Sequence, residues 1–250
     1  MAKPRHLLHA PITEAVIDFR AHAPAEIDVK SLATLAPVVG SEYGPPKGIS
    51  LFEFGWSQAA GSRLTSQPVD DGVIGFRYET ADGRHIAQFR KDGFTFSRLA
   101  PYTEWEAVFS EASRLYRIFV EAGHPEEVTR IAVRYINRLL LPEEQVGDFS
   151  PFLAAPPPLP KEISSLLTNF LTRVQVRDPA TGVEGTITQT IQQGAVEPNK
   201  VPVILDLDFF ELGSRSPAPE AVLPRFATLR EHKNKYFFAS ITEATADLYT

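Results

Sequence analysis

The segment that most constrains the fold is VTRIAVRYINRLLL, residues 128–141, in which polar and apolar side chains alternate with a period of two. In a β-strand this spacing places Arg130, Arg134 and Arg138 on one face. The opposite face then carries the apolar side chains Ile131, Val133, Tyr135, Leu139 and Leu141. A strand with one cationic and one apolar face indicates an antiparallel sheet that is covered on one side only.

The same kind of pattern predicts further strands along the chain. They span residues 11–20, 49–56, 72–79, 84–90, 94–99, 173–178, 183–192 and 201–211. Asp82-Gly83 and Asp92-Gly93 supply the left-handed conformations that tight hairpins need, so we expect a meander there. Whether residues 162–171 form a helix or a strand is left open by their pattern.

Helical spacing of apolar residues predicts three helices. They span residues 28–39, after a capping Asp28; residues 103–123, with a Thr103 to Glu106 capping box; and residues 220–241. Proline is dense in residues 142–160, with three in a row at 156–158, so we expect an extended connector.

Each side of the connector reads as strands followed by one long helix, which predicts an α+β fold of antiparallel sheets. The expected division is an N-terminal half, residues 1–142, a connector, residues 143–160, and a C-terminal half, residues 161–250, packed on the first. A divergent duplication would explain the shared order, although no repeat of residues demonstrates it.

Composition excludes several classes of function. The chain has 250 residues, 25 Lys and Arg against 31 Asp and Glu, a formal net charge of -6 and no cysteine. It therefore has no disulfide, thiolate metal cluster or cysteine nucleophile. The acidic balance disfavours nucleic acid as a partner. Because neither a signal peptide nor an apolar membrane span is visible, we expect a cytoplasmic protein without membrane association. The sequence does not indicate which oligomeric state the protein adopts.

Arginines on neighbouring predicted strands form the candidate ligand-binding set: Arg77, Arg90, Arg130, Arg134 and Arg138. Guanidinium groups suit phosphate, carboxylate or an acidic peptide. The alternative is a solvated face in which they form salt bridges with the candidate charge partners Glu14, Asp18, Asp206 and Asp208. Spacing along one strand lets at most two of the three arginines at 130, 134 and 138 converge on one small anion.

Asp206 and Asp208 share one face of a predicted strand, and such a pair can hold Mg²⁺ or Mn²⁺ against a phosphate group. No further oxygen ligands can be placed, and the histidines lack zinc spacing, so no metal site is predicted. The sequence contains no GxSxG, GxxxxGK[ST] or GxGxxG motif. We therefore predict no cofactor and assign no catalytic residue.

Three motifs carry a resemblance: LLHAPITEAVIDF, FRKDGFTFSRLAPYTEWE and VTRIAVRYINRLLLP, with VPVILDLDFF as a weaker fourth. Together they resemble a sporadically distributed, uncharacterised family of bacterial proteins. The resemblance covers most of the chain and is sharpest in the first 142 residues. It implies a bacterial cytoplasmic source and no catalytic residues, and a patchy distribution suggests accessory, defence or toxin-neutralising genes.

These observations favour a binding or interaction protein that recognises a small anionic ligand or a protein partner through its arginine-bearing sheet face. One alternative is a metal-assisted phosphoryl or nucleotidyl enzyme using Asp206 and Asp208. The other is an accessory or neutralising partner in a defence or toxin–antitoxin type pair.

Overall fold

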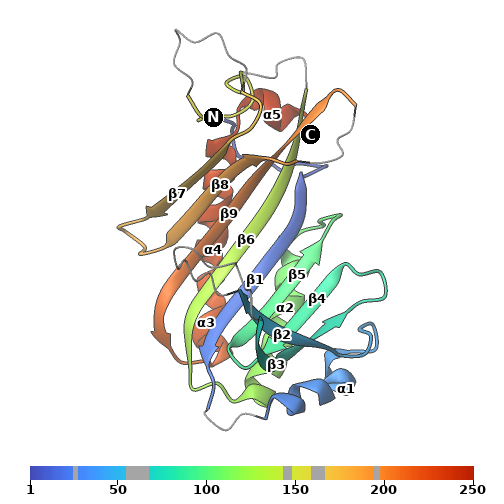
Figure 1. Ribbon diagram of the computed structural model, residues 1–250. Helices are drawn as coiled ribbons and strands as arrows, with labels where there is room; N and C mark the ends of the chain where they lie inside the picture. The colour runs from blue at the N-terminus through green and yellow to red at the C-terminus, as the bar shows by residue number, and fades with distance from the viewer. Residues whose placement is uncertain (25–27, 55–67, 143–147, 159–166, 194–197) are drawn as a thin grey trace, which may run out of the picture.

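The computed structural model describes the chain except for residues 25–27, 55–67, 143–147, 159–166 and 194–197. Its strands are β1 Ile12–His22, β2 Lys47–Phe54, β3 Pro68–Glu79, β4 His85–Arg90, β5 Gly93–Leu99, β6 Glu127–Pro142, β7 Leu171–Arg177, β8 Glu184–Ile191 and β9 Lys200–Arg215. All belong to one nine-stranded sheet in the order β2-β3-β4-β5-β1-β6-β9-β8-β7 (Figure 1). Every pairing is antiparallel, which together with the helices confirms the α+β class.

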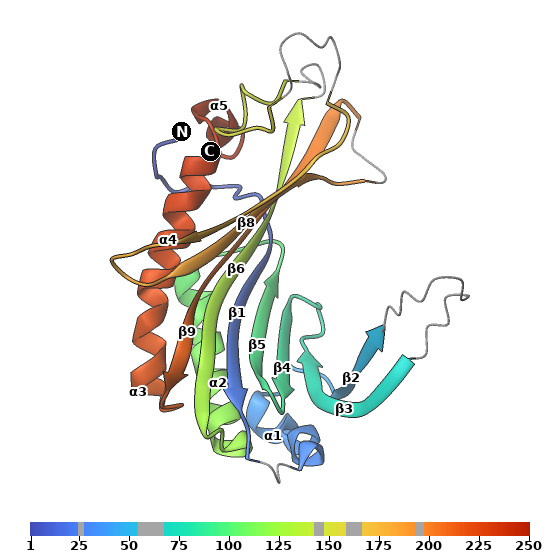
Figure 2. The same cartoon turned by 60° about the vertical axis from the view of Figure 1, so that its left-hand side comes forward.

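The helices are 3-10 Val29–Thr34, α1 Ala36–Val39, α2 Trp105–Gly123, α3 Pro219–Val222, 3-10 Leu223–Arg225, α4 Phe226–Ser240 and α5 Glu243–Asp247. The two long ones, α2 and α4, lie on the same side of the sheet (Figure 2). No helix in the described part of the chain is long and apolar enough to cross a membrane.

Aromatic side chains fill the layer between the sheet and these helices. Phe19 of β1 stacks on Tyr116 of α2 with ring centroids 4.0 Å apart, and it also meets Phe226 of α4 at 5.0 Å. All three side chains are fully buried. Aromatic pairs of this kind contribute beyond their buried area, so Phe19 ties both helices to the middle of the sheet.

Period-two alternation gives the strands their two faces, as expected for β6. Ile131, Val133 and Tyr135 are buried under the helices, and Arg134 is exposed on the other side. The hairpin that joins β4 to β5 requires glycine at its end. Gly93 has φ +147°, and a Cβ there would lie 2.0 Å from the carbonyl oxygen of Phe19.

Two runs of strands, β1 to β5 before α2 and β6 to β9 before α4, share one strand order, and the second run begins with β6, before the connector. In each, the first strand lies beside the last strand before the long helix: β1 beside β5, and β6 beside β9. The sheet continues across the middle because β1 also pairs with β6, with Val16 opposite Arg134. Duplication, and the division of the chain into halves at residues 143–160, stay predictions. In the connector Phe149, Phe152 and Leu153 are buried in the core.

The start of α2 differs from the expected capping box. Its N-cap is Glu104, without a side-chain cap hydrogen bond, so the prediction for Thr103 is wrong. The helix begins one residue later than the box requires, and the third helical position is then occupied by Ala107. Glu106 instead accepts a hydrogen bond from Arg230 at 3.1 Å.

Prolines break two of the expected helices. Residues 28–39 form a 3-10 segment, capped by Asp28 as predicted, and the separate turn α1. Residues 220–241 divide into α3, a 3-10 turn and α4. Pro37 and Pro224 lie at these breaks, and proline lacks the N–H that a continuous helix needs. Residues 55–56 of one expected strand, and 162–166 of the open segment, lie outside the described residues.

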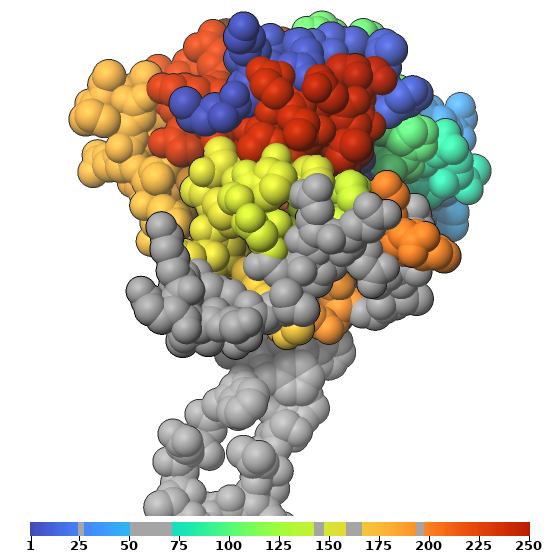
Figure 3. Space-filling model, turned by 90° about the horizontal axis from the view of Figure 1, so that it is seen from above, coloured from blue at the N-terminus to red at the C-terminus, as the bar shows by residue number. Residues whose placement is uncertain are grey.

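The two ends of the chain lie against each other, as Figure 3 shows in blue and red. Arg5 pairs with Glu243 and with Asp247 of α5, both at 2.6 Å. The backbone N–H of Ala2 donates to the carbonyl of Phe238 at 3.0 Å. The N-terminal segment is thereby held beside α4, where it forms one wall of a pocket.

Candidate functional site

The sheet side opposite the helices carries the arginine row, and the carboxylates expected as partners pair with its first two members. Arg130 donates to Asp18 at 3.0 Å and to both oxygens of Asp208 at 2.9 and 2.8 Å. Arg134 donates to both oxygens of Asp206, at 2.9 and 2.6 Å. The bidentate pair of Arg134, and the charge-assisted bonds of Arg130 to two carboxylates, fix both guanidinium planes against the sheet.

Asp18 connects these pairs to the neighbouring strands. It is 7% exposed, pairs with Arg20 at 3.2 Å, and accepts a hydrogen bond from Thr95 at 2.7 Å. The Thr95 hydroxyl accepts from Arg90 at 3.0 Å, and an Arg90 nitrogen lies 3.7 Å from Asp18. One carboxylate therefore serves three arginines.

Burial and pairing act in opposite directions on the charges of this face. Burial raises the pKa of Asp208, and the adjacent Arg130 opposes that shift. The hydrogen bond with Asp206 raises the pKa of Arg134. Arg130 also lies over the ring of Phe210, 4.6 Å from its centroid, so the strand face supports the cation by packing as well as by charge.

A hollow of about 530 Å³ opens on this face. Six of the predicted residues line it: Glu14, Asp18, Arg90, Arg130, Arg134 and Asp208. Three others lie outside it. Arg77 pairs with Glu79 on β3 at 2.7 Å, Arg138 donates to Gln192 at 2.8 Å, and Asp206 holds Arg134 from outside the hollow.

The sequence left open whether these arginines bind an anionic ligand or form salt bridges with the candidate charge partners. The structure combines a hollow with paired guanidiniums. Asp206 and Asp208, proposed as metal ligands, have their oxygens bonded to Arg134 and Arg130. Within the described ranges, no group of three or more His, Asp or Glu side chains could hold a metal ion.

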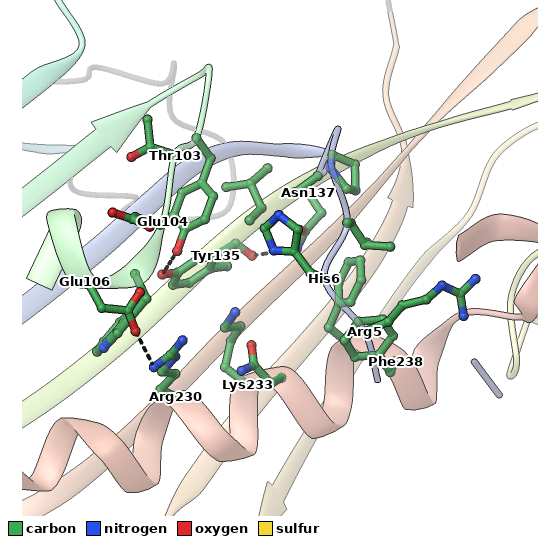
Figure 4. Close-up of a pocket in the computed structure, with 18 residues that line it drawn as sticks. Arg5, His6, Thr103, Glu104, Glu106, Tyr135, Asn137, Arg230, Lys233 and Phe238 are labelled. Atoms are coloured by element: carbon green, nitrogen blue, oxygen red, sulfur yellow. Dashed lines mark hydrogen bonds and ion pairs between the residues drawn. The ribbon is translucent and has the colours of Figure 1, made fainter. Parts of the chain in front are cut away.

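A second site lies on the helix-covered side, and the sequence did not predict it. We call it the lysine pocket. It has a volume of about 390 Å³ and lies between the N-terminal segment, the start of α2, β6 and α4 (Figure 4). Its polar lining includes His6, Tyr102, Glu104, Tyr135, Asn137, Arg230, Lys233 and Asn234, and its apolar lining includes Leu7, Ile12, Trp105, Phe237 and Phe238.

Lys233 points from α4 toward Tyr135 of β6 (Figure 4), and its nitrogen lies 3.9 Å from the centre of the ring. The residue is only 9% exposed. Burial, together with the nearby charge of Arg230, lowers the pKa of Lys233 to about 7. Among the described residues, none forms an ion pair or hydrogen bond with its amine.

The other cations beside the pocket have acidic partners. Arg230 pairs with Glu106 at 3.1 Å and lies 5.3 Å from the centre of the Trp105 ring. The hydroxyls of Tyr102 and Tyr135 are 3.3 Å apart, and burial raises the pKa of each. Both hydroxyls are therefore neutral at physiological pH and can donate hydrogen bonds.

One signal in the sequence could have identified Lys233. It falls on the apolar stripe of its helix with Phe226, Leu229 and Phe237, all of which are buried. A lysine at a core position of an amphipathic helix is unusual, since burial of an unpaired amine is costly. Residues 232–235, with the sequence HKNK, are all polar, so local composition alone does not distinguish the buried Lys233 from its neighbours.

A scan against protein-family models finds no match for this chain. A search of curated proteins also finds no match. The resemblance to a sporadically distributed bacterial family stays a prediction.

Proposed function

We propose that this chain is an interaction protein that binds an acidic segment of a protein partner on the helix-free side of its sheet. A neutralising partner in a toxin–antitoxin type pair would be one such protein. The observation that carries the proposal is an excess of basic side chains on this face of a chain whose net charge is -6.

Strand register defines the members of this face. Its basic side chains are Arg20, Lys47, Arg77, Arg90, Arg130, Arg134, Arg138, Arg173, Arg177 and Lys200. Among the side chains that the structure describes, its acidic ones are fewer: Glu14, Asp18, Glu79, Glu127, Glu184, Asp206 and Asp208. Opposite charge of this kind steers association and selects partners more than it adds affinity.

Two exposed basic side chains lie at the edge of the face. Arg173 and Arg177 are exposed on β7, the outermost strand of the sheet as described. Within the described part of the chain neither forms an ion pair or side-chain hydrogen bond. Since the central guanidiniums already hold carboxylates, a single small anion gains little there. An extended acidic segment that reaches the β7 arginines fits this distribution of charge better.

The test uses a fluorescein-labelled peptide in which glutamate alternates with valine, and its binding is measured by fluorescence anisotropy. We expect Arg173→Glu with Arg177→Glu to weaken binding about tenfold or more, because like charges then face the peptide. Binding to the unaltered chain should also weaken as salt is raised, since exposed charges are screened.

The matched control reverses two exposed cations on the helical side, Arg117→Glu with Lys235→Glu, and so changes net charge equally. This variant should bind the peptide as the unaltered chain does. Equal loss in both double variants would attribute binding to net charge alone and contradict the proposal. So would equal affinity for a peptide with lysine in place of glutamate.

A further inference from the structure

The lysine pocket contains a buried amine that has no ion pair or hydrogen bond with another residue in the described part of the chain. Other buried charges have polar partners: Asp18 pairs with Arg130, Glu211 pairs with Arg225 at 3.0 Å, and Arg98 donates to the carbonyl oxygen of Pro101 at 3.0 Å. Lys233 instead faces a cavity and the ring of Tyr135. Because a buried cation without a carboxylate is destabilising, its retention at this position points to a use for the amine.

The pocket keeps this amine unprotonated to an unusual degree. With a pKa of about 7, half of Lys233 is neutral at that pH, against roughly one in three thousand for a lysine at the ordinary value of 10.5. A neutral amine is a nucleophile, and desolvation in an apolar pocket is how such lysines are activated.

The rest of the lining suits a small carbonyl compound. Trp105, Phe237 and Phe238 supply apolar surface for the body of a ligand. Tyr102 and Tyr135 carry neutral hydroxyls that can donate hydrogen bonds to a carbonyl oxygen. The volume of about 390 Å³ falls within the range of small-molecule sites.

We propose that Lys233 is the nucleophile of a binding site for a small aromatic or aliphatic aldehyde or ketone, which it holds as an imine. The Nζ lone pair attacks the carbonyl carbon, and one Nζ proton passes to the carbonyl oxygen to give a carbinolamine. Nζ loses its second proton as the hydroxyl leaves as water, so one carbon–nitrogen double bond replaces the carbon–oxygen one. No oxidant or reductant takes part. This site is separate from the helix-free face and independent of the function proposed for it.

Several charged or titratable groups surround the amine. They are Arg5 and His6 from the N-terminal segment, Tyr102, Glu104 and Glu106 near the start of α2, Tyr135 from β6, and Arg230 from α4. Arg5, Arg230 and Glu106 are engaged in ion pairs. The neighbouring charge of Arg230 favours the neutral form of Lys233.

The experiment treats the intact protein with benzaldehyde and sodium cyanoborohydride, which reduces an imine to a stable secondary amine. Peptide mass spectrometry then compares Lys233 with Lys235, an exposed lysine on the same helix. At pH 7 we expect Lys233 to be labelled about tenfold or more faster than Lys235. The labelling rate of Lys233 should rise with pH around a midpoint near 7.

Lys233→Met should abolish this labelling, and Lys235→Met should leave it unchanged. Equal labelling of the two lysines, or none at Lys233 in the folded protein, would overturn the proposal. A second reagent, formaldehyde, separates reactivity from binding. Preferential methylation of Lys233 without benzaldehyde labelling would reveal a reactive amine without a ligand pocket, and would also overturn it.

Discussion

The helix-free face and the lysine pocket differ in how their charged side chains are paired. On the face, Asp18, Asp206 and Asp208 hold the guanidiniums of β6 and its neighbours in a network that spans several strands. In the pocket, the amine of Lys233 has an aromatic ring and a cavity beside it. The paired arginines at the centre of the face stabilise the sheet, and the exposed Arg173 and Arg177 on β7 are better placed to meet a partner.

The difference also separates two kinds of binding. A paired guanidinium must give up a carboxylate before it can hold a new anion, so exchange on the face is costly at its centre. The amine of Lys233 has no such partner to lose. Small-molecule chemistry thus fits the pocket, and a broad charged partner fits the face.

The largest expected effect on stability comes from replacing Asp18, the carboxylate that three arginines of the face share. Asp18→Ala leaves Arg130, Arg20 and Arg90 without a shared carboxylate, and Arg90 is only 7% exposed. Losing one member of a buried pair is strongly destabilising, so we expect the free energy of unfolding to fall by about 4 kcal/mol. Urea denaturation followed by circular dichroism measures it.

Glu14→Ala is the matched control, on the same strand and the same face. The Glu14 side chain has no hydrogen bond or ion pair with another described residue, so its loss should change the unfolding free energy by less than about 0.5 kcal/mol. Similar losses in both variants would show that the Asp18 network contributes nothing beyond strand propensity.

Local patterns predicted the helix-free face well. Alternation along β6 identifies which residues point away from the core, and β1 and β4 follow the same rule in part. Burial does not alternate along β5, where residues 93–98 are all buried. Pairing between β6 and β9 could not be read in this way, because those strands are separated by the connector and the β7–β8 hairpin. Of the four predicted carboxylate partners, Asp18, Asp206 and Asp208 lie against arginines of this face. Glu14 forms no ion pair with another described residue.

The lysine pocket escaped prediction because its walls come from four separate segments. Residues 5–12, 102–106, 135–137 and 230–238 meet only after α4 packs on β6. The one signal in the sequence was that Lys233 shares a stripe of α4 with apolar residues. Using that signal requires knowing which stripe of the helix is buried. The break at Pro224 further obscured where that helix begins.

The next largest effect concerns the pH dependence of stability. Lys233 has a pKa of about 7 in the folded chain and the ordinary value of 10.5 when unfolded. Between these values the unfolded chain binds a proton that the folded chain does not, so stability rises with pH and is flat below about 7. From pH 7 to 9.5 this one group should add about 3 kcal/mol to the free energy of unfolding.

Lys233→Met isolates this contribution, since methionine fills similar space without titrating. The difference in the free energy of unfolding between the two proteins should shrink as pH rises, because the cost of burying the ammonium group of Lys233 disappears. Measurements should stop near pH 9.5, since buried tyrosines such as Tyr102 have a raised pKa and lower stability at higher pH. Parallel pH profiles for the two proteins would show that Lys233 is charged in the folded state.

The smallest effect is expected for Arg134→Ala with Arg138→Ala, at the solvent-facing end of the arginine row. The Arg134 side chain is 47% exposed, so water screens its bidentate pair with Asp206, and Arg138 bonds to the neutral amide of Gln192. We expect a loss of about 1 kcal/mol and a melting temperature within a few degrees of the unaltered chain. Differential scanning calorimetry measures both, with Arg173→Ala and Arg177→Ala as an exposed control pair that should change neither. If the double variant instead lost as much stability as Asp18→Ala, the network around Asp18 would extend along all of β6, and the contrast between a rigid centre and an accessible edge would fail.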